Sequence, residues 1–330
     1  MAAVPVRVRG IGAYVPKRVL TNHDLEQMVD TTDEWIVTRT GIKERHMAAD
    51  GEAASDLAYA AACQVLERTG VRPEEIDFIV VATVTGDMQF PSVACLVQNR
   101  LGAKAAAAVD VAAGCTGFLY AFHLARGLIA SGVQKRALVV GAECLSRMLD
   151  WSDRATCVLL GDGAGAVILE AAEDGVEGVL SSHLGSDGGL WDLLYFPGGG
   201  SRNPTTHETV DQGLHFFKMN GQATFKQACG VMERACQQAL EEAGVTLDQI
   251  DLVVPHQANL RILNQLAERM GIPEGKMAVT IDRYGNTSAA SVPMALNDYY
   301  QEGHLKSGDL VLIVSFGAGL TWGAAVFRWS

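Results

Sequence analysis

Apolar runs of strand length alternate with amphipathic segments along the whole chain, and the order of these segments repeats. Residues 62–83 read as an amphipathic helix, a glycine, a short acidic turn and a buried apolar strand. Residues 236–257 show the same order at an offset of 174 residues. The two windows share six identities: Leu66/Leu240, Glu67/Glu241, Gly70/Gly244, Val71/Val245, Ile76/Ile250 and Asp77/Asp251.

Two further pairs of segments extend this correspondence. Residues 109–117 and 280–288 each read as a strand that ends in an acidic residue and is followed by a Gly-Cys-Thr or Gly-Asn-Thr turn. The apolar run 135–143 likewise parallels 308–319. Strands that are apolar throughout are typical of parallel or mixed sheets covered by helices on both faces. We therefore predict an α/β protein built from two similar halves, 1–175 and 176–330, packed about a pseudo-twofold axis.

One stretch interrupts the repeat. Residues 183–217 are rich in glycine, proline and aromatic side chains, and we expect an inserted loop or cap there.

Composition and charge narrow the class of protein. With 330 residues, 48% of them hydrophobic, the chain can bury more than one ordinary core. The net charge is −12, and the sequence contains no run of Lys or Arg residues. Both observations argue against a nucleic-acid partner. An acidic protein partner would therefore need a local basic patch.

Neither the start of the chain nor its apolar runs predict a membrane segment. The first residues lack an uninterrupted apolar stretch, so we expect no signal peptide. The longest apolar runs, 78–84 and 137–142, are too short to span a bilayer. Seven scattered cysteines without a CxxC pair predict a reducing, cytoplasmic location and no zinc site.

Cys115 is the strongest candidate nucleophile. Small residues precede it and a nearly all-apolar helical stretch follows, so it should lie at the N-terminus of a buried helix. The helix dipole would lower the pKa of a thiol there. An inert buried thiol is the alternative interpretation. We expect the other six cysteines to be structural: Cys63, Cys95, Cys144, Cys157, Cys229 and Cys236.

His256 and Asn286 are candidate partners of that thiol. His256 follows an apolar strand that Pro255 ends, and ligands of α/β sheets bind at such strand ends. A helix-capping histidine is the alternative. Asn286 belongs to an ordinary turn signal, but its turn matches that of Cys115 in the repeat. Since equivalent loops of a duplicated fold meet near the shared axis, Cys115 and Asn286 should converge.

Other motif-based interpretations are weaker. The glycine-rich segments 161–169 and 316–327 match neither GxGxxG nor the P-loop; their glycines would let backbone N–H groups approach a reacting centre. A Cys, a His and an Asn also occur in papain-like proteases. The absence of a CGSCW-type segment and the α/β repeat argue against that class.

Several long motifs together resemble the β-ketoacyl-[acyl carrier protein] synthase III enzymes of the thiolase superfamily, and the resemblance covers essentially the whole chain. It implies a five-layered α-β-α-β-α thiolase fold, usually a homodimer, and a ping-pong reaction. An acyl group would move from coenzyme A to the enzyme, and malonyl-[acyl carrier protein] would then lose carbon dioxide and attack it. Metals and redox cofactors play no part in that reaction. The motifs are residues 21–46, 110–118, 153–166, 252–262, 282–293 and 316–325.

The resemblance also assigns roles to individual residues. Cys115 would carry the acyl group, with His256 and Asn286 beside it, and the backbone N–H groups of Cys115 and Ala318 would form the oxyanion hole. For coenzyme A, Trp35 would stack on adenine, Arg39 and Arg154 would contact phosphates, and Thr40 would line the entrance. From the residues alone, packing of Trp35 and solvated arginines would be favoured. The remaining roles are carrier-protein docking by Lys226 and Arg261, and acyl-pocket contacts by Phe90, which would reach the neighbouring subunit, and Leu320.

Two departures from the family pattern bear on the substrate. The turn reads GAGL rather than the commoner GGGF, and the stretch 197–206 is longer than usual. Initiation of fatty-acid synthesis with an acetyl primer is the leading interpretation. Two others remain: a relative from secondary metabolism that takes aromatic or longer primers, and a scaffolding partner without chemistry.

Overall fold

The first sheet of the computed structural model, which describes residues 3–173, 175–176 and 178–330, has the strand order β1-β7-β6-β4-β5. Strand β4 runs parallel to β5 and β6, whereas β7 is antiparallel to β1 and β6. The elements of this half are β1 (Val6–Tyr14), β2 (Arg18–Thr21), α1 (Asn22–Glu26), α2 (Asp33–Thr40), β3 (Glu44–Met47), α3 (Ala54–Thr69), η1 (Pro73–Glu75), β4 (Phe78–Ala82), α4 (Val93–Leu101), β5 (Ala107–Val111), η2 (Gly114–Thr116), α5 (Gly117–Ala130), β6 (Arg136–Glu143), η3 (Leu145–Met148) and β7 (Gly163–Ala171).

The second sheet has the order β8-β13-β12-β11 and repeats four strands of the first. Strands β11 and β12 are parallel, like β4 and β6, and β13 is antiparallel to both of its neighbours. Its elements are β8 (Val179–Ser186), η4 (Gly188–Leu193), β9 (Leu194–Tyr195), α6 (His207–Asp211), β10 (Lys218–Met219), α7 (Gly221–Ala243), η5 (Leu247–Gln249), β11 (Leu252–Pro255), α8 (Leu260–Met270), α9 (Ile281–Tyr284), η6 (Ser288–Ala290), α10 (Ser291–Gln301), β12 (Leu310–Gly317) and β13 (Thr321–Arg328).

The repeated windows fold alike. Helices α3 and α7 both end at a left-handed glycine, Gly70 and Gly244, each with φ 68°. A 3-10 turn and a buried strand follow in each case. The boundary near residue 175 stays a prediction, although the chain passes from the first sheet to the second between Ala171 and Val179.

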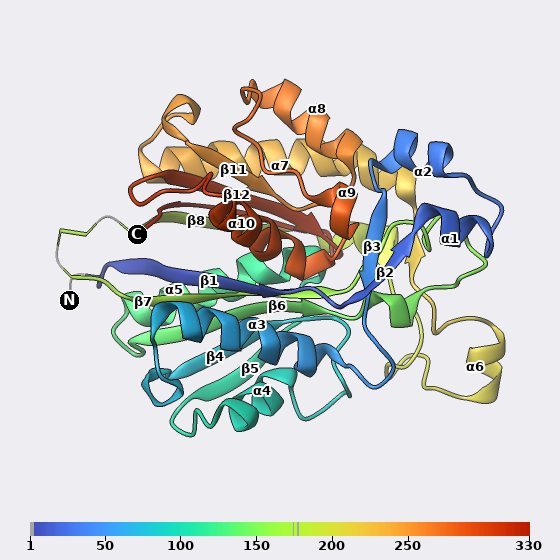
Figure 1. Cartoon of the computed structure of the whole chain (residues 1–330), viewed down its shortest axis with the longest axis horizontal. Coiled ribbons are helices and arrows are strands. Elements are labelled where there is room, and N and C mark those ends of the chain that lie inside the picture. The colour runs from blue at the N-terminus through green and yellow to red at the C-terminus, as the bar shows by residue number, and fades with distance from the viewer. Residues whose placement is uncertain (1–2, 174, 177) are drawn as a thin grey trace.

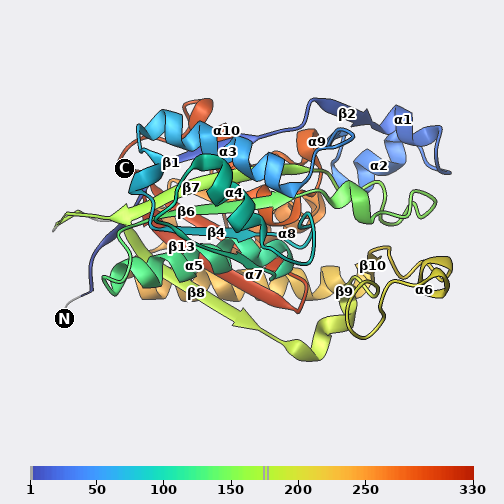
Figure 2. The ribbon, with the colours of Figure 1, turned by 90° about the horizontal axis from the view of Figure 1, so that it is seen from below.

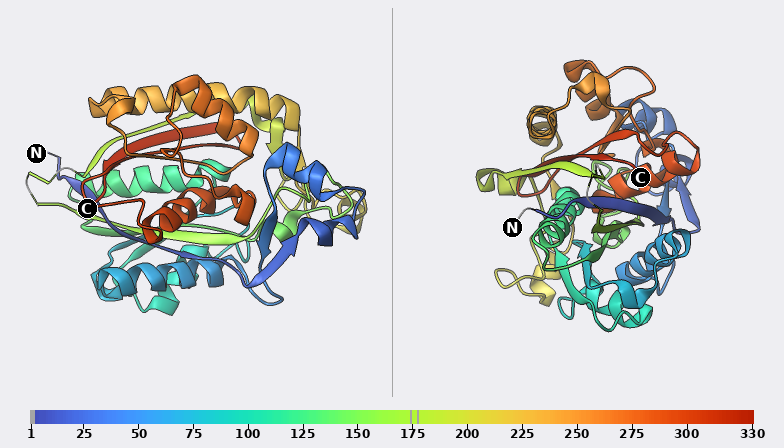
Figure 3. Two further views of the ribbon diagram at one scale, coloured as in Figure 1. Left: turned by 45° about the horizontal axis from the view of Figure 1, so that its top comes forward. Right: turned by 90° about the vertical axis from the view of Figure 1, so that its left-hand side faces the viewer.

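Five layers result (Figure 1). Helices α5 and α10 lie between the two sheets, and a large buried cluster joins them to the inner faces of both. Helices α3 and α4 cover the outer face of the first sheet, and α7 and α8 cover that of the second. Figure 3 shows the same layers from two further directions. The five-layered α-β-α-β-α prediction is confirmed.

Two expectations from the sequence are wrong in detail. The strand expected within residues 280–288 is instead the helix α9, and only an isolated bridge between Met277 and Val253 approaches the sheet. The reason is that Ile281 turns into a buried cluster with residues of α2 and α8. The irregular stretch also begins later than residue 183, because β8 continues to Ser186.

Beyond β8, the short strands β9 and β10 pair and α6 lies next to them (Figure 2). This segment lies at the same end of the molecule as α1 and α2, whereas both labelled termini lie at the other end. Within the described residues, no helix combines the length and apolar character that crossing a bilayer requires.

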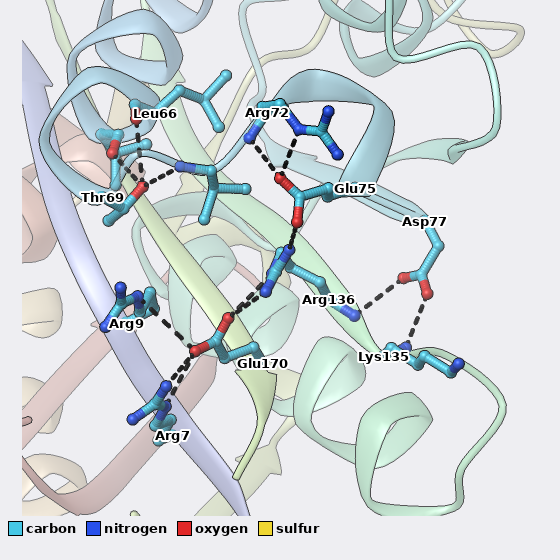
Figure 4. Close-up of polar contacts among 12 residues, drawn as sticks. Arg7, Arg9, Leu66, Thr69, Arg72, Glu75, Asp77, Lys135, Arg136 and Glu170 are labelled. Carbon is cyan, nitrogen blue, oxygen red and sulfur yellow. Dashed lines mark hydrogen bonds and ion pairs between the residues drawn. The ribbon is translucent and has the colours of Figure 1, made fainter.

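An ion-pair cluster ties three neighbouring strands together (Figure 4). The Glu170 carboxylate on β7 binds Arg7 of β1 at 2.6 Å and Arg136 of β6 at 2.8 Å. Arg136 also binds Glu75 at 3.0 Å. The Glu170 side chain is nearly buried, so it fixes these strands to one another.

Candidate active site

Cys115, His256 and Asn286 line one cavity of about 280 Å³. Cys115 lies in η2, directly before α5, while His256 follows β11 and Asn286 follows α9. Cys115 and Asn286, expected to converge, thus face the same space. Most of the wall is apolar, including Leu160 and Phe225. The cavity therefore offers a thiol, an imidazole and a carboxamide in a largely apolar enclosure.

Two glycines allow the backbone turn at Ala318 to lie against that at Cys115. A Cβ on Gly114, whose φ is +52°, would lie 2.9 Å from the Ala318 nitrogen. A Cβ on Gly317 would lie 2.7 Å from the Cys115 nitrogen. Any larger residue would push the two turns apart, so glycine keeps these two N–H groups close.

Burial controls the ionisation of Cys115. Burial is the largest cause that raises the pKa of the thiol; interaction with Ser288 lowers it and the charge of Glu143 raises it, and the resulting pKa is about 11. The expected position at the start of a buried helix is correct. The expected lowering of the pKa is wrong for the free protein, because burial removes the hydration that a thiolate needs.

His256 is held neutral. Its side chain is 1% exposed, and this burial lowers the pKa of the imidazole to about 3. The Nδ1 atom lies 2.6 Å from the Ser291 hydroxyl, and the backbone N–H donates to the Val314 carbonyl at 2.8 Å. With Nδ1 engaged, Nε2 is the ring nitrogen left for a ligand.

Asn286 is fixed by its own backbone and by Ser288. Its N–H donates to the Leu159 carbonyl at 2.9 Å, and its carbonyl accepts from the Gly161 N–H at 3.0 Å. The side-chain Oδ1 accepts the Ser288 N–H at 2.9 Å. This leaves the amide NH₂ as a donor for a ligand.

Sequence reasoning missed Glu143 and Ser288. Glu143 is fully buried at the end of β6, where its carboxylate accepts the Ser288 hydroxyl at 3.2 Å. A charged residue that ends the otherwise apolar run 137–142 was the available signal.

The residues expected to bind coenzyme A fall into two groups. Arg39 and Arg154 are exposed, and their guanidinium groups lie 4.5 Å and 5.1 Å from the ring centre of Trp35. Thr40 is buried instead: its hydroxyl donates to the Ile36 carbonyl at 2.7 Å and accepts the Ile42 N–H at 3.0 Å. Thr40 therefore caps a helix rather than lining an open entrance.

Lys226 and Arg261 are exposed, and Lys226 directly follows Phe225, which lines the cavity. The Arg261 guanidinium lies 5.4 Å from that ring. Phe90 is 83% exposed and lies away from this chain's own cavity wall. Leu320 is buried, and it too lies outside that wall, so the expected acyl-pocket contact is absent within one chain.

Comparison with known proteins agrees with this geometry. Residues 109–188 match the family described as 3-Oxoacyl-[acyl-carrier-protein (ACP)] synthase III, and residues 240–329 match its C-terminal counterpart. The β-ketoacyl-[acyl-carrier-protein] synthase III of Symbiobacterium thermophilum is 54% identical over 325 residues, which cover 98% of each chain.

Solved structures give the same result. The crystal structure of 3-oxoacyl-[acyl-carrier-protein] synthase III from Aquifex aeolicus has a TM-score of 0.91 and 47% identity, covering 98% of this chain and 100% of that one. The priming β-ketosynthase of the R1128 polyketide biosynthetic pathway has a TM-score of 0.93 and 34% identity, covering 100% and 98%. The chain therefore belongs to the 3-oxoacyl-[acyl-carrier-protein] synthase III family, the condensing enzymes of the thiolase fold.

Proposed function

We propose that this protein starts fatty-acid synthesis by joining an acyl primer, carried on Cys115, to malonyl-[acyl carrier protein]. The observation that carries the proposal is the convergence of Cys115, His256 and Asn286 on one apolar cavity. The names of its relatives supply the reaction class, which is acyl transfer followed by decarboxylative condensation.

In the first half-reaction, the Cys115 sulfur attacks the thioester carbonyl of acyl-coenzyme A, and coenzyme A leaves. A covalent thioester divides one difficult carbon–carbon bond formation into two easier steps. The backbone N–H groups of Cys115 and Ala318 would stabilise the tetrahedral oxyanion. The close approach of the two turns at Gly114 and Gly317 supports this assignment.

In the second half-reaction, loss of carbon dioxide leaves an enolate whose oxygen needs hydrogen-bond donors. The Nε2 of His256 and the Asn286 amide would supply them. Because its pKa is about 3, His256 is neutral near pH 7 and brings no acidic proton that could quench the carbanion.

Substrate delivery would use aromatic and basic residues outside the cavity wall. The Trp35, Arg39 and Arg154 cluster would hold the nucleotide end of coenzyme A, since guanidinium groups bind phosphates and an indole ring stacks on a base. Lys226 and Arg261 would supply the basic patch that an acidic carrier protein requires.

A homodimer is part of the proposal. Within the described residues, β5 pairs on one side only, with β4, and Val109 on this edge strand is 43% exposed. An apolar open edge invites pairing with another strand. The exposed Phe90 would then reach the acyl pocket of the second copy.

A second candidate function differs only in the primer. The similarity to a priming β-ketosynthase of a polyketide pathway makes a role in secondary metabolism, with an aromatic or longer primer, the second candidate. Incubating the protein with a panel of acyl-coenzyme A esters and then weighing the intact chain shows which acyl group is loaded. This measurement distinguishes an acetyl primer from longer primers. Preferential loading of long or aromatic groups would reject the acetyl assignment.

Weighing the intact chain after incubation with acyl-coenzyme A also tests the roles of the catalytic residues. We expect Cys115→Ala to abolish covalent acylation, whereas Cys95→Ala, which removes an exposed thiol, should leave it intact. His256→Ala and Asn286→Asp, which keeps the oxygen that accepts the Ser288 N–H, should still acylate but lose about 10²–10³-fold in condensation. Acylation of Cys115→Ala, or equal loss of both half-reactions in the other two variants, would refute these roles.

A further inference from the structure

Glu143 is a fully buried carboxylate that the proposed mechanism does not use. It accepts hydrogen bonds from the Thr85 hydroxyl at 2.5 Å and the Val84 N–H at 3.2 Å, both in the connection after β4. A third donor is the Ser288 hydroxyl. Among the described residues, no Lys, Arg or His forms an ion pair with it. A buried carboxylate without a counter-ion is costly to keep, so its position calls for an explanation.

Ser288 connects this carboxylate to the nucleophile. Its hydroxyl lies 3.2 Å from the Glu143 Oε1, and Ser288 lines the same cavity as Cys115. Interaction with this hydroxyl lowers the pKa of the Cys115 thiol, against the effect of burial. Its φ of +49° lies in the left-handed region, which a serine occupies only when its surroundings hold it there. The Asn286 side chain does so by accepting the Ser288 N–H. One constrained hydroxyl therefore lies between the reactive thiol and a buried acid.

The surroundings of Glu143 suit a carboxyl group that changes its protonation state near neutral pH. Burial raises its pKa to about 7, against the pull of its hydrogen bonds. Its titratable neighbours are two thiols, Cys115 and Cys144, and burial raises the pKa of both. His256, across the cavity, stays neutral.

We propose that Glu143, through the Ser288 hydroxyl, accepts the thiol proton of Cys115 as the sulfur attacks the acyl thioester. This inference rests on the proposed function and adds a proton acceptor to its first step. Neither the family descriptions nor the names of the relatives assign such a role.

The step balances in protons and electrons. The Cys115 S–H proton moves to the Ser288 oxygen while the Ser288 hydroxyl proton moves to Glu143, which becomes a neutral acid. The Cys115 sulfur forms its bond to the acyl carbon, and the bond from that carbon to the coenzyme A sulfur breaks. The departing thiolate keeps that electron pair and takes up one proton as Glu143 releases its own through Ser288. The net transfer carries the Cys115 proton to coenzyme A.

A purely structural role makes a different prediction. As an anchor, Glu143 would only hold residues 83–85, of which Val84 lines the cavity. Its loss would then slow acylation equally at every pH. A proton acceptor instead produces a pH-dependent rate, because only the ionised carboxylate can take the proton.

The test is the pH profile of a single acylation turnover, with acetyl-coenzyme A as donor and the full chain weighed after quenching. Between about pH 5.5 and 9, we expect the wild-type rate to rise through a midpoint near neutrality. Glu143→Gln should lower the plateau rate by about 10²-fold and abolish that midpoint, and Ser288→Ala should do the same. Glu143→Asp should retain the pH-dependent rise.

Thr85→Val is the matched control, since it removes one donor to the carboxylate and leaves the Ser288 link in place. Losing a hydrogen bond to the ionised form raises the pKa of Glu143, so the midpoint should move to higher pH. This variant keeps the proposal testable if Glu143→Gln does not fold.

A Glu143→Gln variant with the wild-type rate and midpoint, or an unmoved midpoint in Thr85→Val, would overturn the inference while leaving the proposed function intact. Wild-type protein that never becomes acylated on Cys115 would overturn the proposed function itself.

Discussion

At the scale of single residues, burial sets how readily the reactive groups ionise. The thiol of Cys115, the imidazole of His256 and the carboxyl of Glu143 each have a pKa displaced toward the neutral form. Loss of hydration is the leading cause in all three cases. A site of this kind stabilises charge only where the reaction creates it.

The buried imidazole should make the fold sensitive to acid. Below pH 6.5 the unfolded chain protonates His256 and the native protein does not, so its contribution to stability falls as pH falls toward 3. Between pH 6.5 and about 5, the free energy of unfolding should fall by about 2 kcal/mol less in His256→Gln than in wild type. Denaturant unfolding at both pH values measures this difference.

Glu143 acts in the opposite direction, so wild type alone does not isolate the effect of His256. Between pH 4.5 and about 7 the native protein holds a proton on Glu143 that the unfolded chain has lost, and acidification there stabilises the fold. The comparison of His256→Gln with wild type removes this shared contribution. Identical pH slopes in the two proteins would contradict the assignment.

At the scale of elements, the site depends on backbone turns that touch without side chains between them. We expect Gly317→Ala to separate the Ala318 turn from Cys115 and lower the acylation rate by about 10²–10³-fold. Gly127→Ala in α5, whose Cβ would meet nothing within 4 Å, is the control and should acylate normally. Unchanged acylation in Gly317→Ala would exclude the proposed oxyanion hole.

The ion-pair cluster of Figure 4 should affect stability without affecting chemistry. Glu170→Gln leaves Arg7 and Arg136 without their shared carboxylate, and we expect a loss of about 2–4 kcal/mol in the free energy of unfolding. Glu75→Gln changes a more exposed partner and should cost less than about 1 kcal/mol. Equal losses in the two variants would mean that Glu170 does not link the strands.

At the scale of the whole molecule, a net charge of −12 repels an acidic carrier protein everywhere except at a local basic patch. The double variant Lys226→Glu and Arg261→Glu should raise the KM for the malonyl-carrier substrate by about 10-fold or more and leave acylation by acyl-coenzyme A unchanged. The double variant Lys135→Glu and Lys306→Glu, at two exposed lysines outside this patch, is the charge-matched control. A similar rise in KM for the control would show that only total charge matters.

The proposed dimer would form at the open edge of the first sheet. Val109→Lys on β5 should reduce or abolish the dimer in sedimentation experiments, because a charge on an edge strand opposes pairing. Val133→Lys, at another exposed valine, should leave it unchanged. A wild-type monomer with full activity would refute the expected dimer and the role of Phe90.

Local pattern predicted most of the elements, because a buried strand needs a continuous apolar run and a helix end needs a glycine that tolerates positive φ. The repeat about Gly70 and Gly244 therefore predicted two similar α/β halves, whereas the five layers were implied by the family resemblance. The pattern failed at 280–288, where Ile281 could pack in a strand or in a helix. Only its neighbours in α2 and α8 decide between the two.

Sequence pattern was enough to predict the α/β repeat, the position of Cys115 before a buried helix, and the pairing of its turn with that of Asn286. Long-range packing set the ionisation of the thiol, the capping role of Thr40 and the link from Glu143 through Ser288. Hydration and hydrogen-bond partners depend on residues that are distant in the chain, as Glu143 and Ser288 are. Propensity and periodicity depend only on neighbours in sequence.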